Sequence, residues 1–184
     1  MKCGALILAA GASTRLGRPK QLVRLGNETL LDRSVRIAEE AGCAPIVVVL
    51  GASEDQIRNR CKLQDVLIVS HPDWAEGMGT TLSRGVQAFE DVQGILVMTC
   101  DMPAVTADHL RTLMASEQVA ASSYGGRNGV PAYFPRDQFP KLLELKGDIG
   151  ARELLQFAQG VELPGGELDI DTSDDLAKAR SIFD

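Results

Sequence analysis

Runs of consecutive apolar residues alternate along this chain with segments in which apolar residues recur every three or four positions. The runs are typical of buried strands, and the segments are typical of helices with one apolar face. The pattern predicts strands at residues 4–10, 45–50, 65–69, 94–99, 119–123, 130–134 and 167–170. It predicts helices at residues 29–41, from 53 to 61, around Leu82, Val86 and Phe89, and at residues 106–115, 139–145, 151–158 and 172–183.

Polar residues and glycines mark where some of these helices should begin and end. Gly42 follows the first long helix in the position of a C-terminal cap. Ser53 with Gln56, and Thr172 with Asp175, have the spacing of a capping box at a helix start. Both pairs therefore predict that a helix begins directly after their first member.

The alternation of strands and helices predicts an α/β fold. Strands that are apolar throughout need cover on both faces, so we expect a mostly parallel sheet between two layers of helices, a three-layer α/β/α arrangement. No linker rich in proline, glycine or serine divides the chain, and we expect residues 1–184 to form a single domain. Ligands of such sheets bind beyond the carboxyl ends of the strands, so the loops there should carry the chemistry.

Composition and charge narrow the possible functions. Of the 184 residues, 45% are hydrophobic and 24% are charged, which is ordinary for a globular protein. The net charge of −6 argues against a general nucleic-acid binder, because such a protein needs a basic face. The longest apolar run, residues 5–10, is too short to span a membrane, and we expect no secretory signal.

Cysteines and histidines offer little material for a zinc site. The relevant residues are Cys3, Cys43, Cys61, Cys100, His71 and His109. None of the cysteines lies in a C-x-x-C pair, so we expect buried, reduced thiols in a cytoplasmic protein.

The loop that follows the first predicted strand, residues 11–20, is rich in small residues and cations. Gly11 and the small Ser13 allow close approach of the backbone, so that amide groups can face an anion. Arg15 and Lys20 can add charge-assisted bonds to phosphate oxygens. The spacing is not that of a P-loop. We interpret the loop as a phosphate-binding candidate, and the alternative is a solvent-exposed glycine-rich turn.

Two carboxylates follow predicted strands. Asp101 comes directly after the strand of residues 94–99, and Asp171 ends the predicted strand of residues 167–170. Because Mg²⁺ takes one or two carboxylates together with phosphate and water oxygens, the two side chains could share one ion. Asp101 could instead cap local amides in a turn, and Asp171 could cap the last helix. Asp169 is a competing ligand, but its expected inward orientation in a strand argues against it.

Residues 76–85 join a glycine-rich loop to a helix start. The free amides of such a start, with the hydroxyl groups of Thr80 and Thr81, suit a base edge or a phosphate. A flexible loop with a threonine cap is an equally good interpretation of these residues.

Several segments together resemble a known family. They are residues 8–20 (LAAGASTRLGRPK), Gly51, 71–73 (HPD), 76–82 (EGMGTTL), 100–103 (CDMP), 129–131 (GVP), 147–152 (GDIGAR) and 169–172 (DIDT). In this order they resemble the nucleotidyltransferases of the MobA-like family, in particular the molybdenum cofactor cytidylyltransferase branch, over nearly the whole chain. The resemblance implies a Rossmann-like nucleotidyltransferase fold. It also implies transfer of a nucleotidyl group from a nucleoside triphosphate, with Mg²⁺, onto a phosphorylated acceptor.

The resemblance also implies roles for individual residues. It implies that Asp101 binds the metal. Asp171, an aspartate near the C-terminal end that precedes a threonine, would complete the metal site. Lys20 and Arg15 would stabilise charge on the leaving pyrophosphate, so that Lys20, Arg15 and Asp101 are the candidate catalytic residues. The candidate nucleotide-binding residues are Leu8, Ala9, Ala10, Gly11, Ser13, Arg15, Lys20, Gly77, Gly79, Thr80, Thr81 and Asp101. Ala10 and Gly11 stand where guanylyl enzymes usually carry two glycines, which favours CTP over GTP.

The acceptor side is expected to be formed by Val130, Pro131, Asp148 and Arg152. The sequence differs here from relatives that carry histidine where Val130 stands. Arg152 could bind an acceptor phosphate or pterin, and it could equally form a surface ion pair.

The expected reaction is attack by the phosphate of molybdopterin on the α-phosphate of CTP, which releases pyrophosphate. Because the attacking oxygen is already anionic near neutral pH, catalysis needs positioning and charge neutralisation and no general base. A client molybdoenzyme is a further expected partner. The alternatives are a transferase acting on a sugar phosphate or polyol phosphate, and a carrier that binds nucleotide or molybdopterin without chemistry.

Overall fold

The computed structural model describes residues 2–148 and 150–183 and is built on one large sheet. This sheet has seven strands in the order β5-β4-β1-β6-β8-β7-β9. The strands are β1 (Cys3–Ala9), β4 (Ile46–Leu50), β5 (Leu67–Ser70), β6 (Gly94–Thr99), β7 (Ala120–Tyr124), β8 (Arg127–Pro135) and β9 (Gln159–Glu162). β8 runs antiparallel to its neighbours β6 and β7, and the other neighbouring strands pair in parallel. The prediction of a mostly parallel sheet is confirmed.

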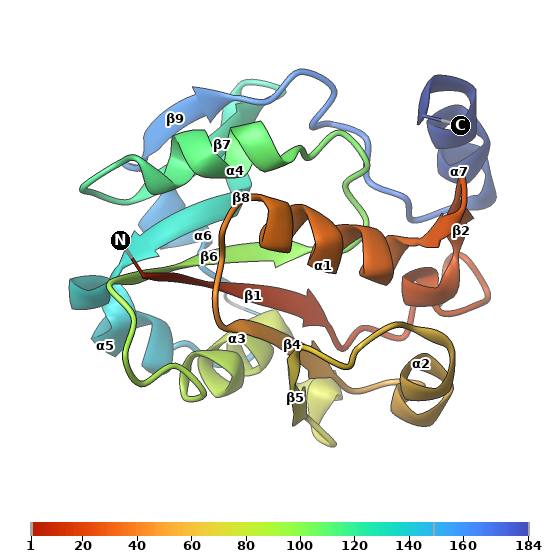
Figure 1. Ribbon diagram of the computed structural model, residues 1–184, viewed down its shortest axis with the longest axis horizontal. Helices are drawn as coiled ribbons and strands as arrows, with labels where there is room; N and C mark the ends of the chain where they lie inside the picture. The colour runs from red at the N-terminus through yellow and green to blue at the C-terminus, as the bar shows by residue number, and fades with distance from the viewer. Residues whose placement is uncertain (1, 149, 184) are drawn as a thin grey trace.

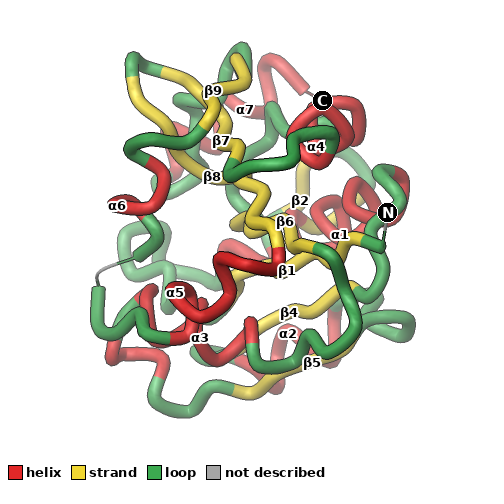
Figure 2. The backbone as a smooth tube through the Cα atoms, turned by 90° about the vertical axis from the view of Figure 1, so that its left-hand side faces the viewer, coloured by secondary structure: helices red, strands yellow, loops and turns green. Residues whose placement is uncertain are grey.

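Helices cover both faces of the sheet. The α-helices are α1 (Leu30–Glu40), α2 (Glu54–Arg60), α3 (Met78–Val86), α4 (Ala107–Met114), α5 (Phe139–Leu143), α6 (Arg152–Leu155) and α7 (Ser173–Phe183). Short elements are the 3-10 helices η1 (Lys20–Leu22), η2 (Trp74–Glu76) and η3 (Arg136–Gln138) and the two-stranded pair β2 (Arg24–Leu25) and β3 (Glu28–Thr29). Figures 1 and 2 show α3, α5 and α6 on one side of the strands and α1 and α4 on the other.

The central strand β1 shows why the sequence folds this way. Every residue of β1 is buried, because its two neighbours pair with it and both of its faces are covered. Leu6 belongs to the apolar cluster formed with α3 and α5, and Ile7 to the cluster formed with α1 and α4. This alternation follows from the two-residue period of a strand. The three-layer α/β/α prediction is therefore confirmed.

The three predicted helix ends are confirmed in position, and two of them have the predicted caps. Gly42 has a φ of +89°, and its N–H bonds to the carbonyl of Glu39 at the end of α1. At the start of α7 the Asp175 N–H donates to Thr172 Oγ1 (3.2 Å), and the Thr172 N–H donates to Asp175 Oδ2 (2.8 Å). α2 begins directly after Ser53 as predicted, but the predicted capping box is not formed there, since Ser53 adopts a left-handed conformation and its side chain accepts no capping bond.

The region from residue 151 to residue 170 differs from the prediction. The helix ends at Leu155, because the side-chain amide of Asn128 donates to the carbonyls of Leu155 and Ala158 and the chain then pairs with β7 as β9. Residues 167–170 do not form the predicted strand. Leu168 and Ile170 are buried instead in a third apolar cluster, together with Val23, Leu25, Leu30, Leu176 and Ala179.

A hairpin of two glycines joins β7 to β8. Gly125 and Gly126 both have positive φ, and Tyr124 pairs with Arg127 directly across the turn. The turn therefore has two residues, and β8 begins at Arg127, three residues before the predicted strand of residues 130–134. Within residues 2–148 and 150–183, no helix has the length and apolar character needed to cross a membrane.

Candidate functional site

Two loops with charged residues leave the sheet side by side. β1 pairs in parallel with β6, and Leu8 lies opposite Thr99 near the carboxyl ends of both strands. The chain after β1 runs into residues 11–20, and the chain after β6 runs into Asp101. The parallel pairing thus brings the two segments to one edge, where ligands of such sheets bind.

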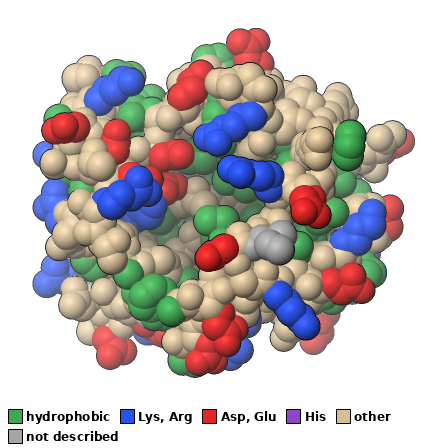
Figure 3. All heavy atoms as spheres, turned by 180° about the vertical axis from the view of Figure 1, so that it is seen from behind, with side chains coloured by type: hydrophobic (Ala, Val, Ile, Leu, Met, Phe, Trp, Pro, Cys, Tyr) green, Lys and Arg blue, Asp and Glu red, His purple; other side chains and the backbone are tan. Residues whose placement is uncertain are grey.

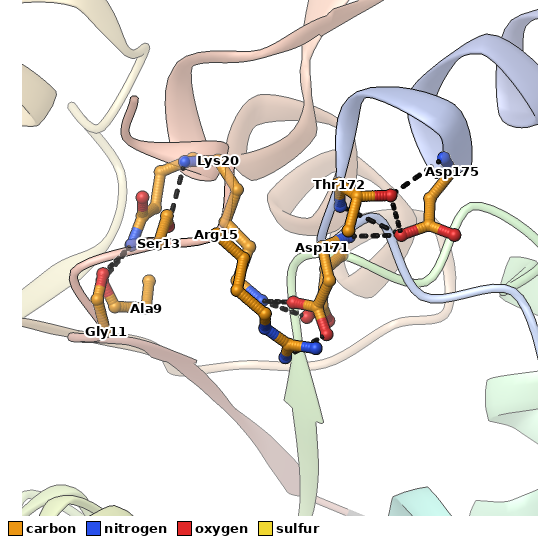
Figure 4. Close-up of polar contacts among 10 residues, drawn as sticks. Ala9, Gly11, Ser13, Arg15, Lys20, Asp171, Thr172 and Asp175 are labelled. Carbon is orange, nitrogen blue, oxygen red and sulfur yellow. Dashed lines mark hydrogen bonds and ion pairs between the residues drawn. The ribbon is translucent and has the colours of Figure 1, made fainter. Parts of the chain in front are cut away.

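Lys20 joins both predicted carboxylates. Its Nζ donates to Asp101 Oδ2 (2.5 Å) and to Asp171 Oδ1 (2.9 Å), and Arg15 donates to Asp171 Oδ2 (2.6 Å) (Figure 4). Only 19% of the Lys20 side chain and 11% of the Asp101 side chain are exposed, whereas Arg15 is 71% exposed. Lys20, Asp101 and Asp171 therefore form a largely buried charge cluster with Arg15 at its outer rim.

The loop that carries Lys20 is folded by its own polar groups. Ser13 has a φ of +55°, and its Oγ accepts the backbone N–H of Lys20 (3.1 Å). The Ser13 carbonyl accepts the N–H groups of Leu16 and Gly17, which closes the turn. These bonds fix where the chain enters η1 and hence where the Lys20 side chain starts.

Gln21 is a site residue that sequence reasoning missed. It is 1% exposed, and its Nε2 donates to the carbonyl oxygens of Ala9 (2.7 Å) and Gly11 (3.2 Å). Gln21 thereby connects η1 to the end of β1 and binds the carbonyl groups on both sides of Ala10. In the sequence, only its position directly after Lys20 indicates that Gln21 could belong to the site. This position does not show that the side chain is buried.

Asp171 reaches the site from the far end of the chain. Ile170, one residue earlier, is completely buried in the third apolar cluster, and its N–H donates to the carbonyl of Asp101 (2.9 Å). On the other side of Asp171 the cap formed by Thr172 and Asp175 fixes the start of α7. The Asp171 carboxylate is thus anchored from both sides although its segment is not a strand.

The electrostatics of the cluster favour a cation. Burial alone would lower the pKa of Lys20, but the charge of Asp101 and hydrogen bonds to both carboxylates outweigh it and raise that pKa. Burial, as the largest cause, raises the pKa of Asp169 to about 6, and the charges of Asp101 and Asp171 contribute to the increase. Asp169 therefore lies close enough to Asp101 and Asp171 for their charges to affect it. The predicted strand, whose geometry argued against Asp169 as a metal ligand, is not formed.

The residues present fit a hard divalent cation. Because one nitrogen atom bonds to Asp101 and Asp171 together, the oxygens of both can reach a single ion. The second oxygen of Asp101, Oδ1, is buried without a hydrogen-bond partner. Within the described parts of the chain no group of three or more His, Cys, Asp or Glu side chains gathers around a metal position. Two carboxylates suit Mg²⁺, which completes its octahedron with water and phosphate oxygens.

A cavity of about 350 Å³ opens beside the charge cluster. It is lined by Leu8, Ala9, Ala10, Gly11, Lys20, Gln21, Trp74, Ala75, Gly77, Met78, Thr81, Thr99, Cys100, Asp101 and Asp148. Of the predicted nucleotide-binding residues, Ser13, Arg15, Gly79 and Thr80 are not in this lining. Gly79 donates its N–H to the Gly147 carbonyl, and Thr80 Oγ1 accepts the Gly147 N–H, so these groups hold the neighbouring loop.

Gly77 allows that loop to pack against the start of α3. Its φ is +120°, and a Cβ there would lie 2.4 Å from the backbone of Gly147 and 2.5 Å from Asp148 Oδ1. No side chain fits this position, and Gly77 has a backbone conformation that is confined to glycine. Residues 77 and 148 therefore meet in the wall of the cavity.

A second cavity, of about 620 Å³, adjoins the first. The two share Leu8, Met78 and Asp148 in their linings. Predicted acceptor residues Val130, Asp148 and Arg152 line the second cavity, whereas Pro131 is buried and its carbonyl accepts a bond from Ser122 Oγ (2.7 Å). Ile149, part of the same predicted segment, lies outside the described residues. Figure 3 shows basic and acidic side chains intermixed around a hollow on the rear face of the molecule.

Arg127 and Tyr124 also line the second cavity and were missed. The guanidinium group of Arg127 lies over the ring of Tyr124, 5.8 Å from its centre. Arg127 lies between the predicted strands of residues 119–123 and 130–134, and the short glycine hairpin places it at the start of β8.

Replacing Gln21 by leucine is expected to lower the free energy of unfolding by about 1–3 kcal/mol, because two carbonyl groups lose their buried donor. The same change should weaken nucleotide binding, since the loop from Ala9 to Gly11 loses its tie to η1. Chemical denaturation and nucleotide titration measure the two effects. Gln87→Leu, which removes an exposed amide, is the control and should change neither. Unchanged nucleotide affinity in Gln21→Leu would remove Gln21 from the site.

Comparison with known proteins identifies relatives along nearly the whole chain. The chain is 32% identical to the purine catabolism protein PucB of Bacillus subtilis, over 95% of this chain and 94% of that protein. It is 31% identical to the nicotine blue oxidoreductase of Paenarthrobacter nicotinovorans, over 82% of this chain and 80% of the relative. It is 28% identical to the molybdenum cofactor cytidylyltransferase of Escherichia coli, over 97% and 95% of the two chains.

Solved structures with the same fold also match nearly the whole chain. The protein Rv0371c of Mycobacterium tuberculosis superposes with a TM-score of 0.87 at 27% identity, and 98% of each chain is covered. A complex of Rv0371c with manganese has a TM-score of 0.80 at 25% identity, over 99% of this chain and 100% of that one. Residues 5–163 match the sequence profile of the MobA-like NTP transferase domain. The chain therefore belongs to the MobA-like NTP transferase family.

Proposed function

We propose that this protein transfers the cytidylyl group of CTP to the phosphate of molybdopterin and releases pyrophosphate. The observation that carries the proposal is the contact of Lys20 with Asp101 and Asp171 beside a cavity lined by both Lys20 and Asp101. A buried ammonium group can bind the phosphate oxygens of a triphosphate, and the paired carboxylates beside it can bind the metal counter-ion. The neighbouring cavity supplies room for the acceptor.

In this proposal the first cavity holds the nucleotide. Lys20 binds phosphate oxygens, and Arg15 adds positive charge from the outer rim as the pyrophosphate leaves. Mg²⁺ held by Asp101 and Asp171 would supply further neutralisation of phosphate charge. The backbone from Ala9 to Gly11, fixed by Gln21, forms the floor against which the nucleotide is positioned.

The reaction needs no general base, and the positions of both histidines are consistent with this. His109 bonds through Nε2 to Ser122 Oγ (2.8 Å), and His71 is buried. Neither histidine belongs to the described residues that line the two cavities. The attacking phosphate oxygen is already anionic, so alignment of donor and acceptor in adjoining cavities is the main contribution of the protein.

The choice of molybdopterin and CTP is supported by the likeness to the Escherichia coli molybdenum cofactor cytidylyltransferase. The second cavity adds a physical argument. Leu82, Val97 and Leu155 give it apolar walls suited to a flat ring, and Arg127 and Arg152 give it positive charge suited to a phosphate. The cytoplasm is the proposed location, since Cys3, Cys43, Cys61 and Cys100 are all buried free thiols.

Thermal-shift titration with CTP, GTP, ATP and UTP, each with Mg²⁺, tests the donor. A ligand at 100 times its Kd stabilises the native state by about 2.7 kcal/mol, and we expect CTP to give the largest shift. A larger shift with GTP would overturn the choice of base.

Pyrophosphate release tests the acceptor and the chemistry. We expect release from CTP with molybdopterin and none with sugar phosphates or polyol phosphates. Release with a sugar phosphate alone would identify the alternative transferase. Tight binding of CTP or molybdopterin without pyrophosphate from any nucleotide would identify a carrier.

A further inference from the structure

One nitrogen atom stands between the two carboxylates that the proposed metal requires. Lys20 Nζ lies 2.5 Å from Asp101 Oδ2 and 2.9 Å from Asp171 Oδ1. A divalent cation that uses both of these oxygens has to take the place of this ammonium group. The other contact of Asp171, from Arg15 to Oδ2, leaves Oδ1 to Lys20.

The side chain of Lys20 is free to leave once another anion is present. Its backbone N–H is fixed by Ser13 Oγ, but among the described residues its ammonium group bonds only to Asp101 and Asp171. Lys20 also lines the nucleotide cavity, so rotation about its flexible four-carbon stem carries the charge towards a bound triphosphate. The buried carboxylates would then be left without a cation, which is costly unless a metal ion replaces the ammonium group.

We propose that Lys20 occupies the metal position of the nucleotide-free protein and cedes it when nucleotide binds, so that metal and nucleotide bind cooperatively. The inference rests on the proposed function only in taking the incoming anion to be a nucleoside triphosphate. By thermodynamic linkage, the factor by which CTP tightens the metal equals the factor by which the metal tightens CTP.

Titration of the nucleotide-free protein with Mn²⁺, followed by the paramagnetic resonance signal of free Mn²⁺, tests the proposal. Lys20→Met should bind Mn²⁺ about tenfold more tightly than the wild type, within the usual range of coupling between sites. Arg15→Met is the matched control, because it removes a cation bonded to Asp171 that does not bridge to Asp101. The control should change Mn²⁺ affinity by no more than about twofold, as expected for a screened surface charge.

A second titration in the presence of CTP completes the test. CTP should tighten Mn²⁺ binding in the wild type, and the gain should be smaller in Lys20→Met. Equal Mn²⁺ affinities of the nucleotide-free wild type and Lys20→Met would overturn the proposal, as would equal effects of Lys20→Met and Arg15→Met. The titration without nucleotide does not depend on CTP or molybdopterin, so its failure is separate from failure of the proposed function.

Chemical labelling keeps the proposal testable if Lys20→Met does not fold. Acetylation of the wild type by acetic anhydride, quantified by mass spectrometry, reports how freely the Lys20 amine reacts. Saturating Mn²⁺ should increase acetylation at Lys20 several-fold and leave Lys141, an exposed lysine, unchanged. No change at Lys20 at saturating Mn²⁺ contradicts displacement.

Discussion

Replacing Asp101 by asparagine is expected to lower the rate of nucleotidyl transfer by about 10²–10³-fold, the cost of losing one preorganised electrostatic contact. The amide has nearly the same shape as the carboxylate, and its oxygen can still accept from Lys20. The negative charge that binds Lys20, and that would bind the proposed metal ion, is lost, however. The substitution therefore separates charge from shape at the buried centre of the site.

Steady-state pyrophosphate release with CTP and acceptor measures this effect, and circular dichroism checks that the fold is retained. Asp174→Asn is the matched control, because Asp174 is exposed in the first turn of α7. The control should keep the wild-type rate. A wild-type rate in Asp101→Asn would show that the carboxylate has no part in the reaction.

Replacing Gly77 by alanine should cause a large loss of both stability and nucleotide binding. The φ of +120° is strained for any side chain, which costs about 1–3 kcal/mol. The new Cβ would also overlap the backbone of Gly147, and relieving such overpacking costs about 1–3 kcal/mol more. Because Gly77 and Asp148 both line the nucleotide cavity, the forced movement should reshape its wall.

Gly11→Ala provides the contrast to Gly77→Ala. A Cβ at Gly11 meets no atom within 4 Å, so the free energy of unfolding should stay within about 1 kcal/mol of the wild type. Chemical denaturation of both variants compares the two glycines directly. If Gly77→Ala unfolds at the same denaturant concentration as the wild type, the loop at Gly147 is not packed as described.

The sequence was sufficient to predict the strands that form the middle of the sheet and several of the charged residues that meet at its edge. β1 and β4 consist of apolar residues and glycine, and β6 does so up to Thr99, so all three are typical of strands that are covered on both faces. In a parallel sheet the loops that follow β1 and β6 leave the same edge, and the structure places Lys20 and Asp101 in contact there.

Other features depend on tertiary contacts that a pattern does not contain. Leu168 and Ile170 alternate as in a strand, but their apolar side chains are buried by α7 and the β2 region rather than by strand pairing. Nothing in the sequence distinguishes Gln21 from an exposed polar residue. Its role depends on the hydrogen bonds that its side-chain amide donates to two carbonyl groups at the end of β1. Arg127 joins the second cavity only because the hairpin turn takes two residues.

The arm that carries Asp171, residues 164–171, lies beyond the family match, which ends at residue 163. Ile170 and Asp171 connect this arm to Asp101 and Lys20 through one backbone bond and one ion pair. A shortened version that stops at residue 163 would keep every strand of the large sheet. It would nevertheless leave Lys20 with one counter-ion in place of two, so trimming the chain to the matched residues would remove one of the two carboxylates of the candidate site.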